Sequence, residues 1–297
     1  MEKIGRYEIL EPLMETGFSD IYIAQDPAAD LKVAIKVFHP KGDNIGEKAQ
    51  YGIDFWRDRF EEEARILRKF DHPNIISVLD SGKTGDCEPY FVMPFISANL
   101  LIEIGEDETK SKKIEDIAEK WKPRAISARR AVTIWRQVLS ALAALHAENL
   151  VHRDIKPQNI LMTAWTDGVP KLCDFGMVKV PGGKGSRSGI WIGTLEYISP
   201  EQQRSATDVD QRSDVYSAGA LMYRMLTGKV SPHVRPPLRP KRYRIPDELG
   251  TLIDDCMQTR RSDRPKDAGE VLRRLDEALP DVNILPANAI RVLRRKI

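Results

Sequence analysis

The spacing of the hydrophobic residues changes once along this chain, near Phe95. Before it, the segment 32–38 reads KVAIKVF, and Val33, Ile35 and Val37 alternate there with other residues at the period of a β-strand. After it, apolar residues recur at every third or fourth position over about four turns of helix: Ala131, Ile134, Trp135, Val138, Leu142 and Leu145. We therefore expect an α+β fold, with a small strand-rich first region and a larger, mainly helical second region.

Further signals divide the chain into regions. Pro94 interrupts the apolar strand YFVMPFI and marks a hinge, because proline cannot donate to a strand ladder. The stretch RFEEEARILRKF has helical spacing, and we expect the polar, glycine-bearing segment before it to form a loop as far as Arg59. The expected regions are residues 1–96 with the hinge, residues 97–280, and a basic extension over 281–297.

Charge and cysteine content exclude several classes of protein. Lys and Arg number 46 against 44 Asp and Glu, so the charge does not point to nucleic acid as a partner. Three scattered cysteines, Cys87, Cys173 and Cys256, are too few for a disulfide framework and fit a reducing cytoplasm. The start, MEKIGRYEIL, has no apolar signal core, and no run approaches the ~18 apolar residues of a membrane span. A span beyond Ile297 in a longer parent protein stays open, as does the oligomeric state.

Two segments have the composition of insertions. The segment 103–124 mixes both charge signs, and we expect a solvated helix and loop there. The segment 231–246, SPHVRPPLRPKRYRIP, is rich in proline and arginine. An irregular surface connection is the favoured interpretation, and a proline-motif ligand for another domain is the alternative.

The stretch VHRDIKPQNILM is followed, after a short connection, by KLCDFG. A polar residue in either stretch alone would be read as a turn former. Together, in this order and spacing, they resemble the catalytic loop and metal-binding motif of eukaryotic-like (Hanks-type) serine/threonine protein kinases, in the compact form common in bacteria. The resemblance extends from about Tyr7 to Leu279. It implies a two-lobed protein-kinase fold, with one main helix in the small lobe and a larger helical lobe.

The resemblance assigns roles in phosphoryl transfer, with ATP and Mg²⁺ as cofactors and Mn²⁺ as an alternative metal. By resemblance, Asp154 orients the substrate hydroxyl and accepts its proton, and Lys156 reaches the γ-phosphate. Asn159 and Asp174 would hold the metal ions. This chemistry needs an aimed hydroxyl and neutralised phosphate oxygens, which explains the combination of carboxylates, amide and lysine.

Lys36 lies beside the small Ala34 in a strand that resembles the VAIK strand of kinases. In that family the lysine contacts the α- and β-phosphates, and a helix carboxylate holds it. The register of EARILRKFDHPNI favours Glu63 as that partner over Glu61 and Glu62. Without the other motifs, Lys36 would be read as an edge lysine and Glu63 as a solvated glutamate.

Residues of the first region resemble an adenine site. Met93 corresponds to the gatekeeper, and the carbonyl of Pro94 and the amide of Ile96 to the adenine contacts. Ile21 and Ala34 would cover the adenine face, although plain strand packing is compatible with both. Cys173, next to the metal motif, would line the same pocket.

The stretch LMETGFSDIYIA reads as a strand, a turn and a second strand. We interpret its turn as a nucleotide-binding loop with a weakened hold on phosphate, and an ordinary hairpin is the alternative. The family pattern Gly-x-Gly-x-x-Gly falls on Met14, Thr16 and Ser19, and Gly17 is not one of its positions. We expect Ser19 to be tolerated and the Thr16 hydroxyl to be able to donate to a phosphate. Met14 would be strained if the turn required a conformation open only to glycine.

Downstream, GTLEYISPE resembles the end of a kinase activation segment, with Ser199-Pro200-Glu201 in place of Ala-Pro-Glu. By resemblance, Arg264 pairs with Glu201, and Asp214 anchors the catalytic loop.

Lys156 and Thr194 resemble serine/threonine kinases, so the expected partners are proteins that carry these hydroxyls. Arg153 beside Asp154 implies control by a phosphorylated activation loop, with autophosphorylation between Asp174 and Glu201. Ser186, Ser188 and Thr194 are the nearby hydroxyls, and for the two serines loop filler is an equal alternative.

Two other classes of function remain. A pseudokinase that binds nucleotide or scaffolds other proteins is favoured by the altered glycine loop and disfavoured by Lys36, Glu63, Asp154, Asn159 and Asp174. A small-molecule phosphotransferase is disfavoured by GTLEYISPE and Arg264.

Overall fold

The computed structural model describes residues 2–40, 52–107, 114–180, 196–205, 208–229, 238, 243 and 245–279. The chain divides into two compact units. The first is Met1–Ser97 together with Asp174–Gly176, and the second is Ala98–Cys173 together with Met177–Ile297.

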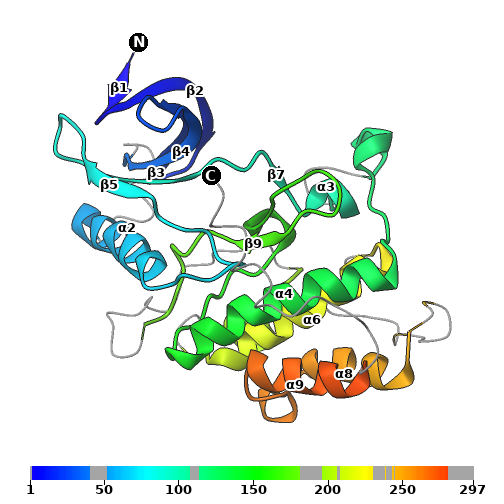
Figure 1. Cartoon of the computed structure of the whole chain (residues 1–297). Coiled ribbons are helices and arrows are strands. Elements are labelled where there is room, and N and C mark those ends of the chain that lie inside the picture. Colours follow the sequence, from blue (N-terminus) through cyan, green and yellow to red (C-terminus); the bar gives the residue numbers. More distant parts are fainter. Residues whose placement is uncertain are drawn as a thin grey trace. The chain divides into compact units, whose positions relative to one another are not determined.

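The first unit is built on a six-stranded antiparallel sheet, blue to cyan in Figure 1. The strand order is β1-β2-β3-β4-β6-β5. The strands are β1 (Lys3–Ile4), β2 (Tyr7–Glu15), β3 (Ser19–Asp26), β4 (Leu31–Phe38), β5 (Asp80–Lys83) and β6 (Pro89–Pro94). The strand expected in KVAIKVF is therefore confirmed as β4.

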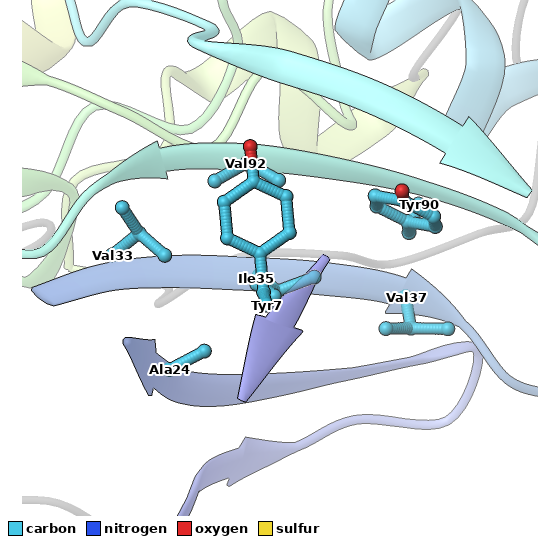
Figure 2. Close-up of a cluster of buried hydrophobic side chains, with 7 residues drawn as sticks. All are labelled: Tyr7, Ala24, Val33, Ile35, Val37, Tyr90 and Val92. Atoms are coloured by element: carbon cyan, nitrogen blue, oxygen red, sulfur yellow. The ribbon is translucent and has the colours of Figure 1, made fainter. Parts of the chain in front are cut away.

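One cluster of buried side chains holds this sheet together, and Figure 2 shows it gathered on β3, β4 and β6 around the ring of Tyr7. The Tyr7 hydroxyl donates to Asp80 at 2.7 Å. Burial and this hydrogen bond raise the pKa of Tyr7 above its usual range. The members of the buried cluster are Tyr7, Ala24, Val33, Ile35, Val37, Tyr90 and Val92. Because side chains alternate along a strand, the packing of Ile35 in this cluster turns Lys36 to the opposite face of the sheet.

Helix α2 (Gly52–Arg68) is longer than the sequence predicted. The expected loop as far as Arg59 is wrong over residues 52–58, which are helical. Aromatic packing explains why the helix begins earlier than expected. Trp56 lies one helical turn before Phe60 and continues the same apolar face. The Phe60 ring packs against Phe38 and Phe91 of the sheet, with centroids 5.7 and 5.2 Å apart. Tertiary packing of these large rings extends the helix beyond the periodic stretch.

The second unit is mainly helical. Figure 1 shows α4 and α6 side by side, with α9 against α4 and α8 against α6. Its helices are α3 (Leu101–Ile104), α4 (Ala128–Ala147), α5 (Pro200–Arg204), α6 (Gln211–Thr227), α8 (Asp247–Cys256) and α9 (Ala268–Ala278). Short 3₁₀ turns are η3 (Ile114–Asp116), η4 (Glu119–Trp121), η5 (Pro157–Asn159) and η6 (Arg261–Asp263). A three-stranded antiparallel sheet, in the order β7-β8-β9, comprises β7 (Ala98–Asn99), β8 (Ile160–Met162) and β9 (Pro170–Leu172).

Helix α4 confirms the predicted apolar stripe. All six residues of the stripe are buried, and the indole N–H of Trp135 donates to the carbonyl of Ala218 in α6 at 2.9 Å. A buried indole needs such a partner, because its N–H would otherwise lose a hydrogen bond to water. The sequence period thus located the central helix of this unit.

The expectation of a solvated segment over 103–124 agrees with the exposed residues 115, 116 and 118–120, but it is wrong for Ile104, Gly105, Asp107 and Ile117, which are buried. Asp107 is buried and accepts a hydrogen bond from Nε of Arg224 at 2.6 Å and another from the Tyr197 hydroxyl at 2.8 Å. Arg224, also buried, donates from Nη2 to the carbonyl of Ile104 at 2.9 Å. A carboxylate and a guanidinium can be buried together when each satisfies the other, and the charged composition concealed this pair.

Of the segment 231–246, the structure describes only residues 238, 243, 245 and 246, of which Leu238 and Ile245 are buried. The rest, like the expected extension 281–297, lies outside the described residues. None of the helices in the described ranges is both long and apolar enough to cross a membrane.

We predict that Arg224→Met lowers the free energy of unfolding by about 3–5 kcal/mol, because it leaves the Asp107 carboxylate buried without its cation. Urea denaturation of the two proteins measures the difference. Arg273→Met is the control, since Arg273 pairs with Glu277 while 61% of its side chain is exposed, and it should cost less than about 1 kcal/mol. Equal losses in the two variants would contradict the prediction.

Candidate active site

A buried ion pair lies at the centre of the first unit. The Lys36 ammonium on β4 donates to Oε1 and Oε2 of Glu63 on α2, both at 2.8 Å. The two side chains are only 12% and 4% exposed. Of the three successive glutamates, Glu63 is thus the one that contacts the lysine. Burial raises the pKa of Glu63 above its usual value, and the charge of Lys36 offsets only part of that shift.

Asp174 lies next to this pair within the first unit. Its Oδ1 is 3.7 Å from the Lys36 ammonium. Its backbone is left-handed, with φ 61°, a conformation that costs a non-glycine residue about 1–3 kcal/mol unless its surroundings hold it. Such strain is typical of functional positions, and here it falls on the residue predicted to bind metal.

The turn between β2 and β3 is closed by Thr16. Its hydroxyl donates to the carbonyl of Ser19 at 2.8 Å and accepts from the Ser19 N–H at 3.0 Å. The expectation that this hydroxyl could donate to a phosphate is therefore corrected, since its hydrogen is used within the turn. Ser19 is buried. Gly17 is not among the described glycines that have a positive φ.

Met14 does not carry the predicted strain. It lies in β2, opposite Ile21 of β3, and it is absent from the described non-glycine residues that have a positive φ. A residue in a strand ladder adopts extended backbone, which any side chain allows. Its side chain is 55% exposed, so the bulk points out of the sheet and needs no glycine-like conformation.

The tip of this turn is tied to helix α2, a contact that sequence reasoning missed. The ring of Phe18 stacks on Trp56 with centroids 4.2 Å apart and an angle of 14° between the planes. The N–H of His39 donates to the carbonyl of Phe18 at 2.9 Å. No local pattern signals a pair 38 positions apart; an aromatic residue on each segment was the only available sign.

The predicted adenine contacts lie close together in the sheet. Ala34 of β4 pairs with Met93 of β6, and the neighbouring pair brings in Pro94. Ile21 of β3 pairs with Lys36 on the other side of β4. Of the predicted adenine contacts, Ala34 is buried, and the other four are half-buried: Ile21, Met93, Pro94 and Ile96, which follows the end of β6.

The catalytic-loop candidates meet in the second unit. The Lys156 ammonium donates to Oδ2 of Asp154 at 2.8 Å. The Asn159 amide donates to the same oxygen and to the Asp154 carbonyl, both at 2.8 Å. Two donors on one oxygen fix the plane of the buried carboxylate. Cys173, which the sequence assigned to the nucleotide pocket, belongs to this unit and its Sγ lies 3.4 Å from the Asn159 carbonyl.

Asp214 of α6 holds the backbone of that loop. Its two oxygens accept from the N–H groups of His152 and Arg153 at 2.7 and 2.8 Å. The Nδ1 of His146 accepts from the Ala268 N–H, so its Nε2, 3.1 Å from Asp214, carries the proton that it donates. Burial tends to raise the pKa of Asp214, but the hydrogen bond from His146 and those from the loop N–H groups outweigh it and lower the pKa. The anchor thus stays charged and holds Arg153 at φ 69°.

A second buried pair fixes the start of α5. Arg264 donates from Nη1 and Nη2 to the two oxygens of Glu201 at 2.6 and 2.8 Å, and Ser213 adds a hydrogen bond of 2.8 Å. Burial tends to raise the pKa of Glu201, but the bonds from Arg264 outweigh it, so the pKa is lowered. The candidate phosphorylation sites Ser186, Ser188 and Thr194 lie outside the described residues.

Comparison with known proteins agrees with this geometry. The family model of the protein kinase domain matches residues 7–274. The serine/threonine-protein kinase pkn2 of Myxococcus xanthus is 34% identical over 231 residues, which cover 76% of this chain and 25% of that protein. PknL of Mycobacterium tuberculosis is 36% identical over 225 residues, or 75% of this chain and 50% of PknL. The probable serine/threonine-protein kinase CPE1738 of Clostridium perfringens is 31% identical over 295 residues, which cover 94% of this chain and 39% of that protein. The chain spans between a quarter and a half of the length of these relatives.

We predict that the stability contributed by Glu201 depends on pH. Because its folded-state pKa is lowered, its contribution is full above its unfolded pKa of about 4.3 and is lost as the pH falls through the folded value. Glu201→Gln should therefore unfold about 3 kcal/mol more easily than the wild type near neutral pH. Urea denaturation across the acid range should show that difference shrinking below about pH 4. A difference that stays constant would contradict the assignment.

The Phe18–Trp56 stack should appear as an energetic coupling of about 1 kcal/mol. Unfolding free energies of Phe18→Leu, Trp56→Leu and the double variant provide the cycle. The single changes should together cost more than the double change, because either one already removes the stack. Phe55→Leu with Phe18→Leu is the matched control, since Phe55 contacts Trp56 edge-on at 5.3 Å. Additive costs for Phe18 and Trp56 would rule out the coupling.

Proposed function

This chain belongs to the protein kinase family, and from that premise we propose that it transfers the γ-phosphoryl group of Mg·ATP to serine or threonine hydroxyls of proteins. The observation that carries the proposal is the buried Lys36–Glu63 pair, with both bonds at 2.8 Å and Asp174 at 3.7 Å. A lysine and a carboxylate are costly to bury. A pair retained beside a strained aspartate is what phosphate binding requires, and a purely structural sheet would not need it.

Lys36 would neutralise the α- and β-phosphates, with Glu63 holding its ammonium in place. Ile21, Ala34, Met93, Pro94 and Ile96 would bind the adenine.

The turn that contains Thr16, Gly17 and Ser19, with Met14 before it, would lie along the phosphates. Because the Thr16 side chain is engaged within the turn, the backbone N–H groups would supply these contacts.

Asp174 and Asn159 fit a magnesium ion by their donor chemistry. Mg²⁺ prefers hard oxygen ligands. The Asp174 side chain is 44% exposed, and the Asn159 amide nitrogen is directed to Asp154, so its oxygen is the atom suited to a cation. When bound, the metal would neutralise charge on the phosphate oxygens, and Mn²⁺ could replace it.

The Asp154 carboxylate would orient the attacking hydroxyl and take its proton. Lys156, which donates to Asp154 at 2.8 Å, is suited to move between that carboxylate and a γ-phosphate, since its side chain is flexible and charged. Asn159 would hold the carboxylate plane for the proton transfer.

The choice of serine and threonine is supported by the printed names of the relatives, all serine/threonine-protein kinases. We further propose a cytoplasmic location and autophosphorylation on the segment between Asp174 and Glu201. Arg153 would be the cation that a phosphate there engages. At present the Arg153 guanidinium donates from Nε to the carbonyl of Met177 at 2.6 Å.

The test is incubation of the purified chain with labelled ATP, Mg²⁺ and a basic protein substrate. We expect incorporation by the wild type and a loss of about 10²–10⁴-fold in Asp154→Asn, since a general base contributes about that much. Asp174→Asn should abolish transfer, and mass spectrometry should place phosphate between Asp174 and Glu201 in the wild type only.

Ser262→Ala is the control, because its hydroxyl bonds only to the exposed Asp263 among the described contacts. It should leave transfer unchanged. Full activity of Asp154→Asn would overturn the roles assigned here. Nucleotide binding without transfer in every protein would instead indicate a pseudokinase.

A further inference from the structure

Arg59 of α2 grips the segment that carries Asp174. Its Nε and Nη2 donate to the carbonyl of Gly176 at 3.1 and 2.7 Å. Both residues belong to the first unit, although they lie 117 positions apart in the chain. Two N–H groups that converge on one carbonyl fix its position more firmly than a single donor.

The spacing along α2 relates this contact to the ion pair. Arg59 lies four residues before Glu63, so both side chains leave the same face of the helix. A Cβ on Gly176 would lie 3.3 Å from Oε2 of Glu63 and 3.5 Å from Oδ1 of Asp174. The Gly176 backbone therefore packs directly on the Glu63 carboxylate, between the two side chains of α2.

Asp174 needs such a hold. Its φ of 61° is left-handed, and a non-glycine residue keeps that conformation only where its surroundings impose it. The next carbonyl, that of Met177, is held within the second unit by Arg153 at 2.6 Å. Two arginines thus fix successive carbonyls just after the aspartate.

We propose that Arg59 is a positioning residue that holds Asp174 in its metal-binding orientation through the Gly176 carbonyl. The inference rests on the proposed function, since it assumes that Asp174 binds the metal of Mg·ATP. Arg59 does not contact substrate. Its loss should weaken metal binding in the nucleotide complex and leave nucleotide binding without metal unaffected.

A merely structural role predicts something different. If Arg59 only stabilised α2, its replacement would disturb the Lys36–Glu63 pair and weaken nucleotide binding with and without metal alike. Metal dependence therefore separates the two roles.

The experiment is calorimetric titration of the full chain with ADP, first in EDTA and then at increasing Mg²⁺. For Arg59→Gln we expect the Mg²⁺ concentration at half-saturation to rise about 10-fold, as for lost partners of metal ligands in other sites, with the metal-free ADP affinity unchanged. Arg59→Lys keeps the charge and one donor, so its Mg²⁺ concentration at half-saturation should lie between those of the wild type and Arg59→Gln. If Arg59→Gln does not fold, Arg59→Lys provides the test. In turnover, KM for Mg²⁺ should rise while kcat at saturating Mg²⁺ stays near that of the wild type.

Arg65→Gln is the matched control. Arg65 is on the same helix and pairs with Glu62, but 63% of its side chain is exposed, so its replacement should change neither affinity. The inference would be overturned if Arg59→Gln and Arg59→Lys both kept the Mg²⁺ dependence of the wild type. It would also be overturned if ADP affinity fell equally with and without metal. A wild type whose ADP binding ignores Mg²⁺ would instead contradict the proposed function.

Discussion

The Lys36–Glu63 pair is the interaction on which the first unit depends. Burying two charges costs several kcal/mol, about as much as a domain's net stability, unless each group is satisfied by the other. Both lysine–carboxylate bonds are 2.8 Å. If β4 and α2 moved apart, each charge would be left without its partner, and the cost of burying it would no longer be offset. Trp56, Arg59 and Glu63 follow one another at three and four residues along α2 and contact the turn, the Asp174 segment and the lysine. One helix face thereby holds three separate parts of the candidate site.

The second unit applies the same principle to a loop without regular structure. The backbone around Asp154 cannot form a ladder, and its buried N–H groups need partners. The Asp214 carboxylate supplies them from α6, and the hydrogen bonds from His146 and from the loop itself keep it ionised. A helix residue thus substitutes for the missing strand partner. The left-handed Arg153, with φ 69°, is the local strain that this anchor supports.

The sequence predicted those parts that depend on local period or on a fixed motif. The β4 alternation and the α4 stripe were visible because one buried face repeats every two or 3.6 residues. The Lys36–Glu63 and Glu201–Arg264 contacts followed from family motifs. The sequence did not reveal Asp107–Arg224, Phe18–Trp56 or Arg59–Gly176, since each joins segments at least 38 positions apart without a repeating pattern. The charged composition of the segment 103–124 suggested solvent exposure and so hid the buried Asp107–Arg224 pair. The early start of α2 depended on aromatic packing, which has no local pattern.

The altered turn shows why composition alone misjudged a loop. Glycines in a phosphate-binding turn give the backbone freedom, which has to be lost when a ligand orders it. Here the Thr16 hydroxyl bonds to both the N–H and the carbonyl of Ser19, and the Phe18 ring rests on Trp56 at 4.2 Å. Side-chain contacts thus order the turn before any ligand arrives, and a preorganised loop has less entropy to lose on binding. Replacing glycines by residues that close the turn is therefore compatible with a phosphate-binding role, because the backbone N–H groups remain while their flexibility does not.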